Sequence, residues 1–310
     1  MKSFLVVTLQ LLALICLFGV WIAPITRSID PSVSDWVVLF GRFCYAALVV
    51  IVGAKVMGRI NSRSYPERIR NLLRRKDGMN VLVAGFYLAS SYFAYTVSFR
   101  LSSHLAPALS LGNIPIVWIL LVYFRRSVKE TPLTFSLAVG ILFATGSFLI
   151  PGEGGTINAA TGWGLVASIF LAAFLIKAEK LPRQAPSYAI VAWYCLVGTA
   201  MGFLGLLGSF SPEFIRILVR PEFHLKMIGL GAGTVAAFFL YTWVLGRVSP
   251  LIVSSFLVLT PAANSIMDKL FLGHSKITPM QNTGVWLVSV MLVILYFTKA
   301  YEDKANRESS

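Results

Sequence analysis

The sequence predicts an all-α integral membrane protein with ten transmembrane helices, arranged as two inverted five-helix repeats. Three observations lead to this prediction. The composition is too apolar for a soluble chain, ten apolar segments have the length of a bilayer span, and one stretch of sequence recurs at a constant offset.

The composition excludes a soluble globular domain. The chain of 310 residues is 57% hydrophobic and only 13% charged, whereas soluble domains are about 45–50% apolar and about 25% charged. A soluble core of this length could not bury the excess, so lipid is the expected solvent. The net charge of +14 does not indicate nucleic-acid binding, because no domain-sized polar segment carries it.

The apolar segments have the length that a bilayer span requires, about 20 residues. The first one is interpreted as a membrane helix and not as a cleaved signal peptide, because it has spanning length and no small-residue cleavage site. The ten predicted spans are 4–25, 35–57, 78–99, 104–124, 133–150, 162–179, 188–208, 226–246, 250–272 and 278–298.

The basic residues predict the orientation. Alternate loops hold 18 of the 27 Lys and Arg residues, the opposite loops hold 6, and Arg42, Lys55 and Lys269 lie within spans. The positive-inside rule therefore places both termini in the cytoplasm. The expected location of the protein is the plasma (inner) membrane. The most basic loop, 58–77, is expected to anchor the topology and to contact anionic lipid headgroups.

The internal repeat has an offset of 146 residues, which aligns Tyr95-Thr96 with Tyr241-Thr242 and Pro115 with Pro261. The repeat predicts two units, residues 1–155 and 156–310, with five spans each. Because five is odd, the second unit enters the membrane upside down. Inverted repeats of this kind are a recurring transporter architecture, with the substrate site near the midplane between the halves.

Several short motifs recur in the two halves, and one further pair, Arg42-Phe43, lies in the first half. The recurring motifs are Ser102-Ser103-His104-Leu105-Ala106 with Ile114-Pro115, Ser249-Pro250-Leu251-Ile252 with Thr260-Pro261, and the glycines Gly140, Gly146 and Gly284. In these motifs the chain resembles the EamA-like family of the drug/metabolite transporter superfamily. The resemblance implies two five-helix units and export of a metabolite. The family's Gly-Glu pairs fall on Ser127-Val128 and Gly273-His274, so both glutamates are missing.

Arg42 is the most informative single residue. It lies about 10 Å into the second span at 1.5 Å per residue, and a charge at that depth is expected to face the bundle interior. One interpretation is an anchor for an anionic substrate, with Tyr45 as an aromatic floor one turn deeper. The other is a structural arginine that pairs with Asp35 one heptad earlier.

Polar and aromatic side chains within the other spans are candidates for a substrate cavity. Tyr87, Ser91, Tyr95 and Ser98 share one face of the third span, at helical spacing. The further candidates are Asn113 in the fourth span, Trp193 in the seventh, Phe238 and Tyr241 in the eighth, and Asn264 and Lys269 in the ninth. Pro115 and Pro261 are the predicted hinges, because proline bends a span.

The function expected from these patterns is secondary transport of a small amphipathic metabolite, such as an amino acid, by alternating access. A flippase for a lipid-linked or amphipathic anionic substrate and a non-transporting scaffold are the alternatives. No enzyme motif, metal-ligand spacing or cofactor motif is recognisable, so no catalytic residue, metal or cofactor is expected. The expected partners are a small-molecule substrate and the lipid bilayer.

Overall fold

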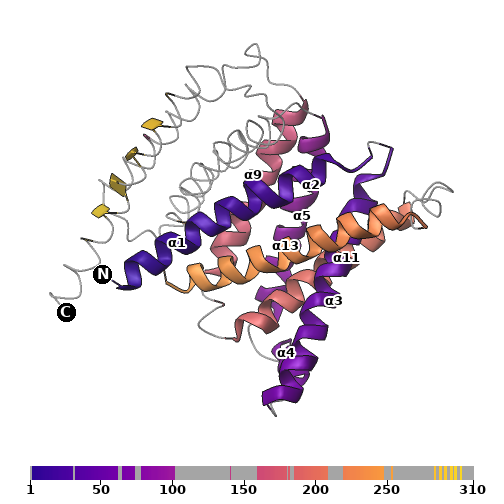
Figure 1. Cartoon of the computed structure of the whole chain (residues 1–310), viewed down its shortest axis with the longest axis horizontal. Coiled ribbons are helices and arrows are strands. Elements are labelled where there is room, and N and C mark those ends of the chain that lie inside the picture. Colours follow the sequence, from indigo (N-terminus) through magenta and orange to yellow (C-terminus); the bar gives the residue numbers. More distant parts are fainter. Residues whose placement is uncertain are drawn as a thin grey trace.

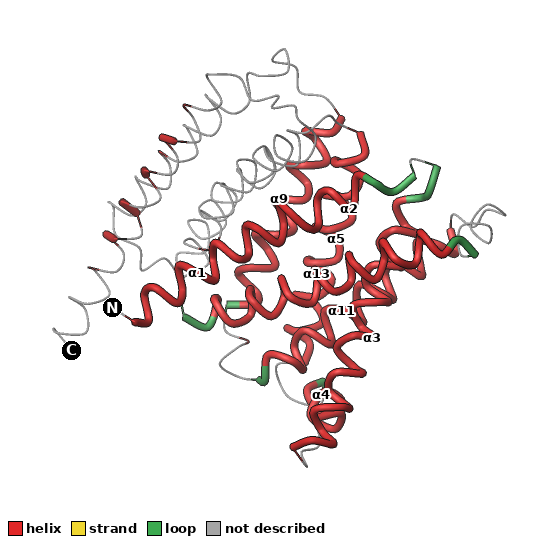
Figure 2. Tube along the Cα trace, viewed as in Figure 1, coloured by secondary structure: helices red, strands yellow, loops and turns green. Residues whose placement is uncertain are grey.

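The computed structural model describes residues 2–30, 32–61, 65–73, 78–101, 159–179, 185–208 and 219–247, with isolated positions between 140 and 301. Regular structure in these residues is helical throughout (Figure 2). Six of the ten predicted spans fall on described helices, with ends that differ by at most five residues from the prediction. The predicted spans 104–124, 133–150, 250–272 and 278–298 lie outside the continuously described residues.

The described helices follow one another along the chain as Figure 1 labels them. They are α1 Lys2–Cys16, the π-helical segment η1 Leu17–Ile22, α2 Ala23–Arg27, α3 Asp35–Asn61, α4 Tyr65–Leu72, α5 Gly78–Leu101, α9 Ala159–Ala178, α11 Ser187–Gly208 and α13 Pro221–Leu245.

Four of these helices are long and apolar enough to cross a membrane: α3, α5, α11 and α13. In α9 the apolar stretch is shorter, Gly162–Ala178. The all-α class is confirmed for the described residues, and these four helices are compatible with a membrane protein. The count of ten spans and their division into two repeats stay predictions.

The first predicted span is not one continuous α-helix. A six-residue π-helical turn interrupts it at Leu17, and α2 begins beside Pro24, whose missing N–H is tolerated at a helix start. The indole of Trp21 in this turn donates a hydrogen bond of 2.8 Å to the carbonyl of Gly229 in α13. A contact with a distant helix therefore accompanies the irregularity, and no local pattern could predict it.

Close packing around α3 depends on glycines of α11. Gly198, Gly202 and Gly205 of α11 face Phe43, Phe40 and Trp36 of α3, in that order. A Cβ added to Gly202 would lie 2.7 Å from both the Cα and the N of Phe40. Small residues at such spacing let two helices approach closely in lipid, where dispersion and not the hydrophobic effect drives association.

Helix α3 runs in the opposite direction to α5 and to α11, and α5 runs in the opposite direction to α9. Trp36 at the start of α3 stacks on Phe93 near the end of α5, with ring centroids 3.9 Å apart. Phe93 in turn meets Trp163 at the start of α9, and Gly205 near the end of α11 faces Trp36. We call this end of the molecule the Asp35 end.

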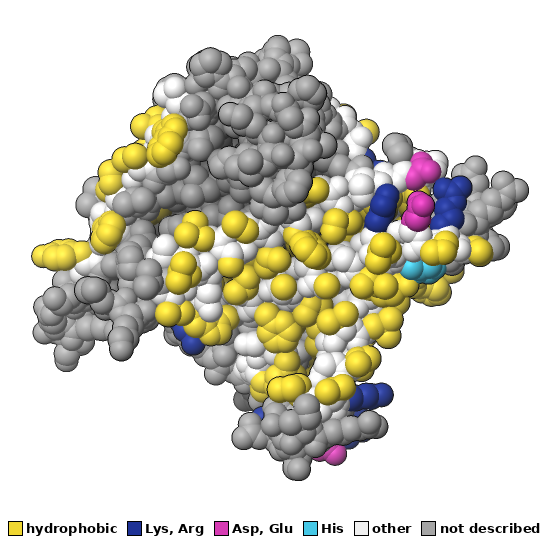
Figure 3. All heavy atoms as spheres, viewed as in Figure 1, with side chains coloured by type: hydrophobic (Ala, Val, Ile, Leu, Met, Phe, Trp, Pro, Cys, Tyr) yellow, Lys and Arg dark blue, Asp and Glu magenta, His cyan; other side chains and the backbone are white. Residues whose placement is uncertain are grey.

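Apolar side chains dominate the surface along α1 and α13, which run alongside one another (Figures 1 and 3). Leu9, Leu12 and Ile228 are among the exposed side chains there. Charged side chains gather towards the ends of the helices in the same view (Figure 3). An apolar belt between polar ends is the surface that a bilayer requires.

The short helix α4 lies after α3 and packs against α11 and α3. Trp193 of α11 donates an indole hydrogen bond of 2.7 Å to the carbonyl of Ile69, and Leu72 is buried. Arg68 and Arg70 are exposed. The apolar side of α4 therefore faces the bundle, and its basic residues remain outside.

Candidate functional site

Arg42 of α3 is fully enclosed in the protein, with 1% of its surface exposed. Its Nε donates a hydrogen bond of 2.6 Å to the hydroxyl of Thr234 on α13. Its guanidinium carbon lies 4.0 Å from the ring centroid of Tyr92 on α5, a cation–π distance. Both terminal nitrogens, Nη1 and Nη2, are buried without a hydrogen-bond partner. Contacts among three helices thus hold the charge and leave both terminal nitrogens unpaired.

Two glycines allow α3 and α13 to approach closely enough for the contact between Arg42 and Thr234. A Cβ on Gly41 would lie 2.9 Å from the sulfur of Met227. On the other helix, a Cβ on Gly231 would lie 2.9 Å from the backbone N of Ala46. A larger residue at Gly231 would meet the α3 backbone, separate the helices and move Thr234 away from the guanidinium.

Aromatic side chains from five helices surround the Arg42 guanidinium and its neighbours. Phe238 is the centre of this group, with ring centroids 5.5 Å from Tyr92, 6.0 Å from Phe43 and 6.2 Å from Tyr194. Phe174 of α9 extends the group to Tyr194 and Tyr241. Most of these pairs meet edge to face, the arrangement that aromatic quadrupoles favour. We call this set of residues the aromatic cluster.

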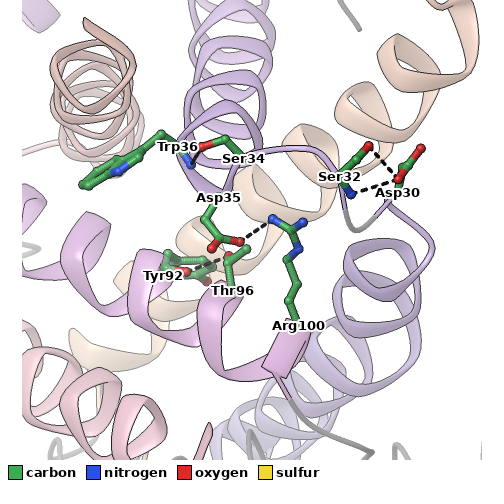
Figure 4. A network of polar contacts seen from close by, with 8 residues as sticks. All are labelled: Asp30, Ser32, Ser34, Asp35, Trp36, Tyr92, Thr96 and Arg100. Carbon is green, nitrogen blue, oxygen red and sulfur yellow. Dashed lines mark hydrogen bonds and ion pairs between the residues drawn. The ribbon is translucent and has the colours of Figure 1, made fainter. Parts of the chain in front are cut away.

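The structural interpretation of Arg42 as the partner of Asp35 is wrong. Asp35 pairs with Arg100 at the end of α5, with 2.5 Å between carboxylate oxygen and guanidinium nitrogen (Figure 4). Asp35 is in the first turn of α3 and Arg100 in the last turn of α5, where each charge also complements its helix dipole. No carboxylate in the described part of the chain pairs with Arg42.

We expect Asp35→Asn and Arg100→Gln each to lower the free energy of unfolding by about 0.2–1 kcal/mol, the usual range for a partly exposed ion pair. The double variant should lose little more than either single variant, because both remove the same pair. Thermal unfolding of the purified variants measures this coupling. Fully additive losses would contradict the pairing.

Tyr45 does not form the aromatic floor of Arg42, and Tyr92 takes that position instead. The Tyr45 hydroxyl lies 2.7 Å from Nδ1 of His224, in the first turn of α13, and the two rings meet edge to face. The expectation failed because a spacing of three residues does not determine which neighbouring helix each side chain meets.

The other predicted site residues divide into three groups. Tyr95, Phe238 and Tyr241 are buried at the core of the described helices, Phe238 and Tyr241 within the aromatic cluster. Ser91 and Tyr87 face α9 instead, through a hydrogen bond of 2.8 Å from Ser91 to the carbonyl of Ala167 and a ring contact from Tyr87 to Phe170, while Trp193 bonds to α4. Five predicted residues lie outside the described residues: Asn113, Pro115, Pro261, Asn264 and Lys269.

Sequence reasoning did not pair Arg42 with either of two residues that contact it directly, Tyr92 and Thr234. The sequence does contain a signal for Tyr92, because Phe238 is a predicted cavity residue and Tyr92 is its equivalent at the repeat offset of 146 residues. Thr234 shares a helical face with Phe238 and Tyr241, but its role depends on a contact with α3 that the sequence does not encode locally.

A second polar network lies at the Asp35 end, outside the apolar spans. The backbone N–H and hydroxyl of Ser32 donate hydrogen bonds of 2.9 and 2.8 Å to Asp30 (Figure 4). The backbone bond from Ser32 is the main reason that the pKa of Asp30 lies below its ordinary value. Arg220 lies 3.6 Å from Asp30, and Lys226 donates to the carbonyl of Ser28. These contacts connect the α2–α3 loop with the start of α13.

No family model matches the chain, and no curated protein matches it. A crystal structure of a protein shares the fold, with a TM-score of 0.67 over 93% of this chain and 95% of that one. The sequences are 18% identical. At that identity the likeness concerns the fold alone.

Proposed function

We propose that the protein is a secondary transporter that exports a small amphipathic metabolite with a carboxylate, such as an amino acid, and that Arg42 anchors the carboxylate. The supporting observation is a guanidinium, 1% exposed, with two unpaired terminal nitrogens and no carboxylate partner in the described residues. Burying a charge without such partners costs free energy, unless a bound ligand pairs with the charge and accepts its hydrogen bonds. The aromatic cluster beside it suits the apolar part of such a solute.

Contacts between the halves support alternating access as the mechanism. Arg42 and Thr234 belong to different predicted repeats, and so do Tyr92 and Phe238, which occupy equivalent repeat positions and pack against each other. Thr96 and Thr242 are equivalent as well, and each donates 2.8 Å to the carbonyl four residues earlier. Equivalent residues that meet are expected near a pseudo-two-fold axis. We therefore propose two inverted repeats, with both termini in the cytoplasm.

Flux into proteoliposomes tests this function. We expect wild-type protein to move leucine and to discriminate against leucinamide, which has the same side chain without a carboxylate. Arg42→Gln should reduce leucine flux at least about tenfold, because a charge-assisted bond is lost from the bound state, whereas Arg42→Lys should keep part of it. Wild-type flux in well-folded Arg42→Gln protein would contradict the proposal. Scrambling of a fluorescent anionic phospholipid without leucine flux would indicate a flippase instead.

A further inference from the structure

Thr234 differs from the other buried threonines in the described helices, Thr26, Thr96 and Thr242. Thr26, Thr96, Ser168 and Thr242 each donate a hydrogen bond to the carbonyl four residues earlier in their own helix. The hydroxyl of Thr234 instead accepts a hydrogen bond from Arg42 on another helix. Its side chain is completely buried, so solvent cannot replace that contact.

The contacts of Arg42 constrain the guanidinium in two ways. Thr234 holds the Nε edge at 2.6 Å, and the ring of Tyr92 covers one face at 4.0 Å. Rotation of the guanidinium plane would break both contacts. The remaining edge, with Nη1 and Nη2, is the only one with unpaired nitrogens among the described contacts of this residue. That edge presents two parallel N–H donors, the geometry that matches the two oxygens of a carboxylate.

We infer that Thr234 is a positioning residue, which orients Arg42 so that Nη1 and Nη2 bind a substrate carboxylate end-on through two hydrogen bonds. This inference rests on the proposed function and adds a substrate class: a carboxylate whose two oxygens approach along the guanidinium axis. Because Thr234 and Arg42 lie in different predicted repeats, the orientation also depends on how α13 packs on α3.

The chain offers a conservative variant and a matched control. In Thr234→Val the new side chain has nearly the same shape but no hydrogen-bond acceptor. Arg42 therefore keeps its charge, but the orientation of its guanidinium plane is no longer fixed by that bond. Thr234→Ser keeps the acceptor. Thr242→Val removes a buried hydroxyl from the same helix, but that hydroxyl donates to the carbonyl of Phe238 and not to Arg42.

Binding of N-acetyl-leucine, a monoanion, is measured by titrating the thermal midpoint of the purified full chain, with N-acetyl-leucinamide as the neutral comparison. We expect Thr234→Val to weaken binding of the anion about tenfold, the size of one charge-assisted hydrogen bond, and to leave the response to the amide unchanged. Thr234→Ser and Thr242→Val should bind the anion within about twofold of wild type, a change well below one hydrogen bond.

The outcomes separate this inference from the proposed function. If wild-type protein prefers the anion and Thr234→Val keeps the whole preference, the positioning role is wrong and the anchor stands. If Thr234→Val and Thr242→Val weaken binding of both probes equally, the effect is structural and the positioning role is also wrong. If wild-type protein does not distinguish the anion from the amide, both proposals fail.

Discussion

Gly202→Ala is expected to destabilise the protein and lower its thermal midpoint, although it adds a single methyl group. The new Cβ would lie 2.7 Å from the Cα and N of Phe40, atoms of the α3 backbone that no rotamer change can move. The helices must therefore separate, and overpacking of this kind costs about 1–3 kcal/mol or more. Separation would also loosen the contacts of Phe43 and Trp36 with Gly198 and Gly205. Size-exclusion profiles and thermal midpoints of purified protein measure the loss.

Gly53→Ala is the matched control for this substitution. Gly53 lies in the interior of α3, and a Cβ there would have nothing within 4 Å. Alanine favours a helix over glycine by about 0.8–1.0 kcal/mol, so this variant should be as stable as wild type or slightly more stable. If Gly202→Ala protein behaved like Gly53→Ala protein, the close packing of α11 on α3 would be refuted.

The sequence predicted the helices well where lipid sets their length. Spans such as 35–57 and 188–208 differ from α3 and α11 by only a few residues, because apolar runs of about 20 residues have few alternatives in a bilayer. The π-helical turn at Leu17–Ile22 was not predicted. It accompanies a contact between Trp21 and Gly229, which are 208 residues apart in sequence.

The candidate site was predicted less completely, and the errors share a cause. Spacing within one helix suggested Asp35 and Tyr45 as neighbours of Arg42, but the actual neighbours Thr234 and Tyr92 come from other helices. Periodicity gives the face of a helix and not the residue opposite it. The repeat offset is the exception, because Tyr92 and Phe238 are equivalent by sequence and do meet in the structure.

Arg42→Met is expected to leave the ligand-free protein as stable as wild type or to stabilise it, by up to about 4 kcal/mol, while it abolishes stabilisation by carboxylates. The guanidinium is completely buried with two unpaired nitrogens, and apolar replacement of buried charge is often neutral or stabilising by about 1–4 kcal/mol. Methionine can fill the irregular space against Tyr92. Thermal midpoints with and without N-acetyl-leucine measure both effects.

If the role of Arg42 is purely structural, Arg42→Met should instead destabilise the ligand-free protein. If Arg42 served mainly to join α3 to α13, its removal would leave Thr234 without a partner and cost about 1–3 kcal/mol. Thr234 has an alternative, however, because a helical threonine can bond the carbonyl four residues earlier, as Thr96 and Thr242 do. A large drop in the midpoint of ligand-free Arg42→Met protein would therefore exclude the anchor as the reason for this buried charge. An unchanged or higher midpoint together with lost carboxylate binding would indicate that a bound ligand offsets the cost of burying the Arg42 charge. Proteins retain such destabilising residues at functional sites.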